Sequence, residues 1–135
     1  MDIVSNNLTG DDITETIAVL TKMQVFNLFS NNVGGPLPAV LGKFVNLKVL
    51  DLEFNKFTGP VVIEEYVALD QLEEYLVGSN DLTGTLPGAI ENWTMLKSLS
   101  LGLNKLDGPI PPEIGSLSEL GKNGKRRWMV FSIFG

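Results

Sequence analysis

Asn55-Lys-Phe-Thr-Gly59, Asn80-Asp-Leu-Thr-Gly84 and Asn104-Lys-Leu-Asp-Gly108 are three copies of one short motif in this 135-residue chain. Two earlier copies are Asn-Asn-Leu-Thr-Gly at 6–10 and Asn-Asn-Val-Gly-Gly at 31–35. The asparagines that open the five copies are spaced by 25, 24, 25 and 24 residues: Asn6, Asn31, Asn55, Asn80 and Asn104. A fixed period of this length predicts coils that stack on one another and share a core.

Apolar residues precede each asparagine at fixed distances of eight, five and three positions. The four complete sets are Met23, Phe26, Leu28; Leu47, Leu50, Leu52; Leu72, Tyr75, Val77; and Leu96, Leu99, Leu101. The last two members of each set alternate with other residues, which is the period of a strand with one buried face. Each repeat is therefore predicted to contain a short strand that ends at the asparagine.

A second apolar series follows each motif glycine with spacings of four, three and three residues, as in Leu86, Ile90, Trp93 and Leu96. This spacing suits one face of a short helix or 3₁₀ turn. The two longer repeats take up their extra residue before this series begins, between Gly10 and Ile13 and between Gly59 and Val62. The predicted unit is strand, asparagine turn, loop and helical turn.

The pattern Leu-x-x-Leu-x-Leu-x-x-Asn-x-Leu-x-Gly-x-Ile-Pro, clearest in 72–87 and 96–111, resembles the plant-specific class of leucine-rich repeats. The resemblance covers residues 1–120, about four full repeats and a partial first one. It implies an α/β repeat solenoid: a right-handed superhelix with a concave parallel sheet, 3₁₀ turns on the convex side, and short second strands at the Leu-Thr-Gly segments. It also implies that the asparagines form a structural ladder of side-chain bonds to backbone groups. At the Ile-Pro position Ile63 and Thr14 stand in place of proline, so the geometry of the outer strand is in doubt in those two repeats.

Composition excludes several functions. The chain has no cysteine and no histidine, so it has no disulfide, no thiolate, and neither the commonest general base nor the commonest metal ligand. Residues 1–120 hold six basic and 16 acidic side chains, a net charge of −10, which disfavours nucleic-acid binding. No cofactor is expected. The chain shows no signal peptide or transmembrane segment, which indicates a cytoplasmic protein if the sequence is complete; the resemblance implies an extracellular or cell-surface one.

Residues 121–135 do not follow the repeat, and we call them the C-terminal tail. The tail holds Lys122, Lys125, Arg126 and Arg127, a charge of +4, followed by an aromatic run. Three interpretations stay open: an unrelated end of the coding sequence, an improvised cap in which Trp128, Val130 and Phe131 cover the exposed core, or contact with an anionic membrane.

Strand alternation predicts that the residues six, four and two before each asparagine point away from the core. They would form a panel that is apolar at one edge, acidic in the middle and small at the other. We predict ligand contacts at Phe29, Asp51, Glu53, Glu74 and Leu76, with Phe29 and Leu76 as exposed apolar groups. A solvated sheet face is the simpler alternative.

Catalysis and metal binding are disfavoured. The three carboxylates of this panel could serve a glycosidase only inside a pocket that excludes water, which an open sheet lacks. A calcium site there would lack a dedicated glycine-turn loop. Asn7 and Asn92 begin the sequons Asn-Leu-Thr and Asn-Trp-Thr, and are possible glycosylation sites.

The sequence thus predicts a non-catalytic module that binds a protein or peptide, with no nucleic acid, and with membrane contact only within a larger receptor. The resemblance extends to ectodomains of receptor-like kinases and to inhibitors of polygalacturonases. A truncated fragment of a larger receptor kinase, or an inhibitor of the polygalacturonase-inhibiting type, is the alternative.

Overall fold

The computed structural model describes residues 22–122. Asn6, Asn7, the partial first repeat and tail residues 123–135, with Trp128, Val130 and Phe131, lie outside the described residues. The predicted boundary between solenoid and tail at residue 120 falls at the end of the described part and stays a prediction.

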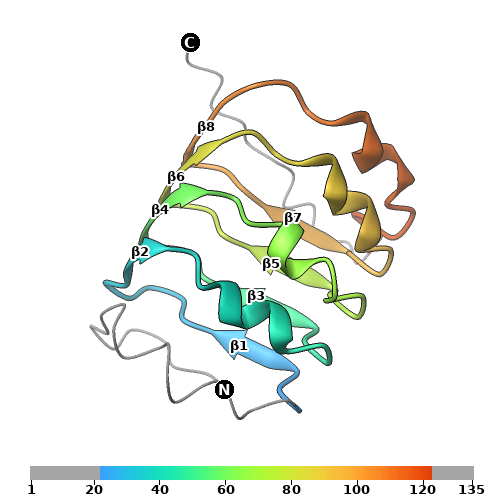
Figure 1. The fold of residues 1–135 in the computed structure, drawn as a ribbon, viewed down its shortest axis with the longest axis horizontal. Helices are drawn as coiled ribbons and strands as arrows, with labels where there is room; N and C mark the ends of the chain where they lie inside the picture. The colour runs from blue at the N-terminus through green and yellow to red at the C-terminus, as the bar shows by residue number, and fades with distance from the viewer. Residues whose placement is uncertain (1–21, 123–135) are drawn as a thin grey trace.

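Four coils stack side by side, and each contributes one strand to each of two parallel sheets (Figure 1). The first sheet, which we call the concave sheet, has the order β1-β3-β5-β7, with β1 at Val25–Asn27, β3 at Val49–Asp51, β5 at Glu74–Leu76 and β7 at Ser98–Ser100. The second sheet contains β2 (Gly34–Pro36), β4 (Lys56–Pro60), β6 (Asp81–Gly84) and β8 (Lys105–Leu106). The predicted repeat solenoid, including the second set of strands, is confirmed.

The register of the concave sheet follows the repeat period. Phe26, Leu50, Tyr75 and Leu99 lie in one row across its four strands. They and their apolar equivalents two positions later are at most 2% exposed, so the predicted buried face is correct. Because every coil supplies side chains to the same row, burial of one coil depends on the coil beside it.

The helical segments of the described coils are all 3₁₀: η2 (Ala39–Lys43), η3 (Glu64–Tyr66), η4 (Gly88–Asn92) and η5 (Pro112–Ser116). Three of them follow a proline in an extended conformation, Pro38, Pro87 or Pro111. Ile63, at the equivalent position, has helical angles instead (φ −64°, ψ −33°), and η3 has three residues where the others have five. The repeat without proline therefore does depart from the others.

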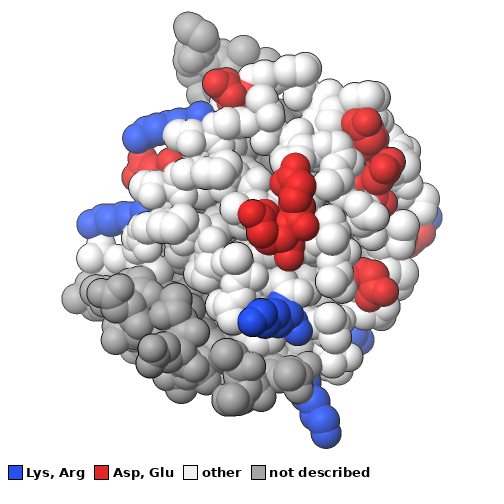
Figure 2. Space-filling model, in the orientation of Figure 1, with Lys and Arg blue, Asp and Glu red and all other residues white. Residues whose placement is uncertain are grey.

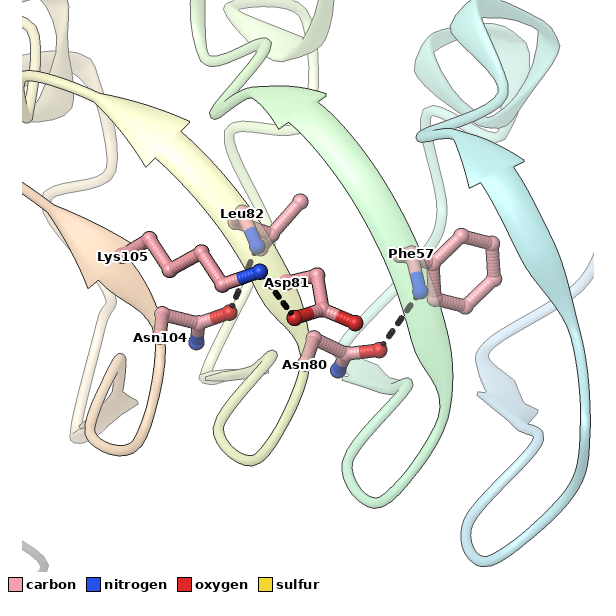
Figure 3. Close-up of polar contacts among 6 residues, drawn as sticks. All are labelled: Phe57, Asn80, Asp81, Leu82, Asn104 and Lys105. Carbon is pink, nitrogen blue, oxygen red and sulfur yellow. Dashed lines mark hydrogen bonds and ion pairs between the residues drawn. The ribbon is translucent and has the colours of Figure 1, made fainter.

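The asparagine ladder forms as predicted in the described coils (Figure 3). The Asn80 amide donates to the carbonyl of Leu52 in the preceding coil at 3.0 Å and to Val77 in its own coil at 3.1 Å. Its Oδ1 accepts the N–H of Phe57 at 2.9 Å. Asn55 and Asn104 make the equivalent bonds one coil away on either side. Asn55, Asn80 and Asn104 thus each join their own strand end to the preceding coil, whereas the Asn31 amide donates to Leu28 O and Phe29 O of its own coil.

The residue before each asparagine has a left-handed backbone, with φ of 55–56° at Ser30, Phe54, Ser79 and Leu103. This turn directs the chain from the concave sheet toward the second sheet. Left-handed angles are uncommon for side chains such as Phe and Leu, so two of the four turns carry a residue that the conformation disfavours.

An aromatic cluster fills the core between β5 and the 3₁₀ segments. The Tyr75 ring lies 4.8 Å from Trp93 and 6.5 Å from Tyr66, measured between ring centroids. The Tyr66 hydroxyl donates to Pro38 O at 2.9 Å, whereas the buried Tyr75 hydroxyl has no hydrogen-bond partner among the described residues. Burial raises the pKa of both tyrosines above the usual value.

The ladder predicts that Asn80→Ala destabilises the protein by about 1–3 kcal/mol, because it leaves a buried N–H and buried carbonyls without partners. The measurement is chemical or thermal unfolding. Asn92→Ala is the matched control, since Asn92 is exposed at the end of η4 and should change stability by less than about 0.5 kcal/mol. Equal effects of the two substitutions would contradict a structural role for the ladder.

The aromatic cluster predicts that Tyr75→Phe leaves stability at neutral pH unchanged or raises it by about 1 kcal/mol, because an unsatisfied buried hydroxyl is removed. A raised folded-state pKa stabilises the protein fully below the unfolded tyrosine value of about 10, and this stability is lost as the pH rises above it. The variant should therefore unfold at higher pH in an alkaline titration.

Tyr66→Phe is the control for this substitution, because it removes a hydroxyl that does have a partner. It should cost about 0.5–1.5 kcal/mol at neutral pH. A loss of stability in Tyr75→Phe as large as this would show that the Tyr75 hydroxyl is hydrogen-bonded in solution.

Candidate functional site

Twelve residues form the outward face of the concave sheet, and we call them the concave panel. They lie in three rows across the four strands: Val25, Val49, Glu74, Ser98; Asn27, Asp51, Leu76, Ser100; and Phe29, Glu53, Gly78, Gly102. Side chains in one row are about 4.8 Å apart from strand to strand. The five predicted contact residues all belong to this panel.

The three panel carboxylates occupy three different rows. Glu74 is in the first row on β5, Asp51 in the second on β3, and Glu53 in the third, beyond the end of β3. Asp51 and Glu53 therefore follow each other along one strand, Glu74 lies diagonally from Asp51, and none of the three faces another directly across a strand pair. Asp51 Oδ1 accepts the N–H of Glu53 at 3.1 Å, so part of the Asp51 carboxylate secures the turn at the strand end.

Glu53 is only 5% exposed, which corrects the expectation that it projects freely from the sheet. Its carboxylate lies over Gly78 on the neighbouring strand, where a Cβ atom would come within 2.9 Å of Oε1. Ser100, two strands away on β7, donates a short hydrogen bond to this oxygen. Because Gly78 has no side chain, Glu53 can reach across β5. The bond to Ser100 therefore links the β3 coil to the β7 coil over the coil between them.

Leu76 is also 5% exposed, so the prediction that it is an exposed apolar group is wrong. Its partners in the row are Asp51 and Ser100, and Gly78 follows it on the same strand. The Glu53 carboxylate bonds to Ser100 beside it. Phe29, Asp51 and Glu74 are partly exposed and are the predicted residues left for direct contact.

An aromatic pair stands at the β1 edge of the panel. Phe29 and Phe54 meet edge to face with ring centroids 5.2 Å apart, and Phe54 is 51% exposed. The sequence analysis missed Phe54, which occupies the left-handed position where the coils on either side have Ser30 and Ser79. The sequence did contain a signal for this contact: a large apolar residue stands at a turn position where the two neighbouring coils have serine.

Two ion pairs flank the sheets. Lys97 and Glu73 approach to 2.7 Å just before β7 and β5, and the hydrogen bond from Lys97 lowers the pKa of Glu73. Lys105 and Asp81 approach to 2.7 Å on the second sheet, where both side chains are well exposed (Figure 3). Exposed pairs of this kind add little stability.

The opposite face also carries negative charge. Figure 2 shows acidic side chains gathered over the position of η3, where Glu64 and Glu65 are exposed. Asn92 is exposed at the end of η4, and its amide donates to Ala89 O at 2.8 Å. Its glycosylation stays a prediction, as does that of Asn7.

Residues 22–122 contain no group of three or more carboxylate, histidine or cysteine side chains that could hold a metal ion. They also contain no helix that is long and apolar enough to cross a membrane.

Comparisons with known proteins agree with the repeat geometry. A family model described as Leucine Rich Repeat matches residues 46–64 and 95–117. No curated protein sequence matches the chain.

Several solved structures are similar over most of the chain. One is the leucine-rich-repeat ectodomain of the membrane receptor kinase GASSHO1/SCHENGEN3 from Arabidopsis thaliana, in complex with CASPARIAN STRIP INTEGRITY FACTOR 2 (31% identity, TM-score 0.81, 88% of this chain and 14% of that one). A second is a TDR receptor (35% identity, TM-score 0.83, 89% of this chain and 20% of that one). A third is the plant peptide hormone receptor RGFR1 in complex with RGF2 (32% identity, TM-score 0.74, 78% of this chain and 17% of that one). The chain spans 14–20% of the length of these proteins.

The bridge between Glu53 and Ser100 generates a prediction. Ser100→Ala removes a donor to a buried carboxylate and should destabilise the protein by about 1.5–3 kcal/mol, measured by unfolding. Ser118→Ala, at an exposed position of the last described coil, is the matched control and should have little effect. If both substitutions cost the same, Ser100 does not hold Glu53 in place.

Proposed function

Because the chain is a leucine-rich-repeat protein of the plant type, we propose that it is a non-catalytic module that binds a protein or peptide through the concave panel. One observation carries this proposal: Phe29, Asp51 and Glu74 lie partly exposed on a single parallel sheet face, with Phe54 extending it. An extended ligand could touch several coils at once there.

The chemistry of the panel favours a ligand with both cationic and apolar groups. Asp51 and Glu74 supply negative charge. The Phe29–Phe54 pair supplies an apolar surface, with Phe29 one strand away from Asp51 and two strands away from Glu74. Glu53 and Leu76 support this surface from buried positions. The negative repeat body disfavours nucleic acid as the partner.

Two of the similar structures contain a bound partner: the GASSHO1/SCHENGEN3 ectodomain is in complex with CASPARIAN STRIP INTEGRITY FACTOR 2, and the receptor RGFR1 is in complex with RGF2. They support a binding role and an extracellular or cell-surface setting for this chain. A segment of a longer receptor ectodomain is the second candidate, favoured by the small share of those receptors that the chain matches. The domain division would then be a repeat body to residue 120 and a distinct tail.

Selection from a random peptide library on the immobilised protein tests the proposal. Peptides that bind the natural sequence should lose at least about tenfold in affinity, equivalent to 1.4 kcal/mol, on the triple variant Phe29→Ala, Asp51→Asn, Glu74→Gln. The matched control changes exposed residues on the other side of the coil: Glu64→Gln, Glu65→Gln and Val67→Ala. Affinity that survives the first variant and falls with the control would place binding away from the panel.

A further inference from the structure

We propose that the turns of the solenoid bind a proline-rich peptide in the polyproline II conformation that carries an acidic residue. The residues directly before and after the ladder asparagines form this surface, which we call the turn edge: Ser30, Phe54, Ser79 and Leu103 before them, and Asn32, Lys56, Asp81 and Lys105 after them. The inference goes beyond the proposed function, which places a ligand on the concave panel. Three observations carry it: exposed apolar side chains, their spacing of two coils, and a lysine without a partner in the described coils.

The residue before the asparagine alternates from coil to coil. The first and third described coils have Ser30 and Ser79 at this position, whereas the second and fourth have Phe54 and Leu103. Phe54 is 51% exposed and Leu103 is 67% exposed. Neighbouring coils lie about 4.8 Å apart at the sheet, so the two apolar residues lie about 9.6 Å apart with a serine between them.

The backbone conformation makes these two apolar residues unfavourable in the protein alone. The angle φ is 56° at Phe54 and 55° at Leu103, in the left-handed region that bulky side chains rarely adopt. Because both side chains are largely exposed, burial within the described coils does little to offset this cost. An apolar partner would supply the missing burial at two positions in one row.

The spacing of about 9.6 Å discriminates among peptide conformations. In a polyproline II helix, residues i and i+3 lie on one face about 9.3 Å apart. An extended strand places residues of one face about 6.8 or 13.6 Å apart, and neither value fits. An α-helix places i and i+7 about 10.5 Å apart, but its i+3 and i+4 side chains would then lie over Ser79. The alternation therefore favours polyproline II, in which no side chain between i and i+3 faces the row.

Lys56 indicates the charge of the ligand. It follows Asn55 at the start of β4 and is exposed. Within residues 22–122 its ammonium group takes part in no ion pair or hydrogen bond. Lys105 differs, because it already pairs with Asp81 at 2.7 Å (Figure 3). The turn edge therefore has one cation available, beside Phe54, and an acidic residue next to the first apolar residue of the ligand would pair with it.

The aromatic pair at one end of the turn edge suits this class of ligand. Proline-rich segments dock on aromatic surfaces, and their preformed conformation reduces the entropy lost on binding. Phe54 meets Phe29 edge to face at 5.2 Å between ring centroids, so the surface at this end is aromatic. Because Phe54 adjoins both the turn edge and the concave panel, the variants below use Leu103 and Lys56, which belong to the turn edge alone.

Three labelled synthetic peptides, titrated with the full-length protein in a fluorescence anisotropy assay, test the ligand class. The first is Pro-Glu-Leu-Pro-Pro-Leu-Pro-Pro, which places its leucines three positions apart. The second, Pro-Glu-Leu-Pro-Pro-Pro-Leu-Pro, has the same composition with the leucines four positions apart. The third is an alanine-rich helical peptide with one glutamate and two leucines seven positions apart.

The first peptide should bind, and each of the others should bind at least about tenfold more weakly. Equal binding of the first two peptides would show that spacing does not matter and would overturn the proposal. Stronger binding of the helical peptide would also overturn it, as would no binding of the first peptide up to about 1 mM.

Substitutions confined to the turn edge test the location. Leu103→Ser with Lys56→Gln should weaken binding of the first peptide at least about tenfold. Serine already occupies this left-handed position in two of the described coils, so the variant should fold with an unchanged unfolding midpoint. Ile110→Ser with Lys43→Gln is the matched control, because it changes an exposed aliphatic residue and an exposed lysine outside the turn edge. The control should bind as the natural sequence does, and equal affinities of the two variants would overturn the proposal.

A variant of the concave panel separates this inference from the proposed function. Asp51→Asn with Glu74→Gln should weaken binding of the library-selected peptides and not that of the proline-rich peptide. A loss of the proline-rich peptide on this variant would place it on the panel and overturn the inference. If only the library-selected peptides bind, the proposed function survives and this inference fails. If the proline-rich peptide binds at the turn edge and the panel variant affects no ligand, the inference stands and the proposed function fails.

Discussion

The hydrogen bonds of the buried asparagines are the interaction on which the solenoid depends. A 24- or 25-residue coil must turn sharply at the end of each concave strand, and the turn leaves carbonyl and N–H groups facing inward. The amide of Asn80 satisfies such groups from two adjacent coils at once. Because a carbonyl and an N–H both need partners, only a side chain with a donor and an acceptor at this reach serves, which explains why the residue recurs without change.

Much of the fold could be predicted from the sequence because the determinants repeat. The row from Phe26 to Leu99 is apolar in all four coils, so each coil supports the assignment of this position to the buried face. The predicted irregularity at Ile63 is confirmed for the same reason: three repeats have a proline at this position, and the local geometry changes in the described repeat that lacks it. Because the apolar positions recur at the same places in every coil, few other strand registers would bury them.

The site could be predicted only as far as strand alternation determines it. Alternation correctly assigns Phe29, Asp51 and Glu74 to one partly exposed face. It does not predict that Glu53 lies over Gly78 and bonds to Ser100, because that contact is diagonal, spans 47 residues and depends on a missing side chain. The Phe29–Phe54 contact is missed because it joins a strand residue to a turn residue of the next coil. Features that occur once leave no periodic signal.

The reach of the ladder has a consequence for how such a protein can change in length. Each amide bonds only within its own coil and the one before it, so an in-frame duplication of a whole unit would find every required partner already in place. The Glu53–Ser100 bridge, in contrast, spans three coils and would be separated by a unit inserted between them. A lineage that gains or loses units by recombination would therefore keep its scaffold and lose this surface feature first.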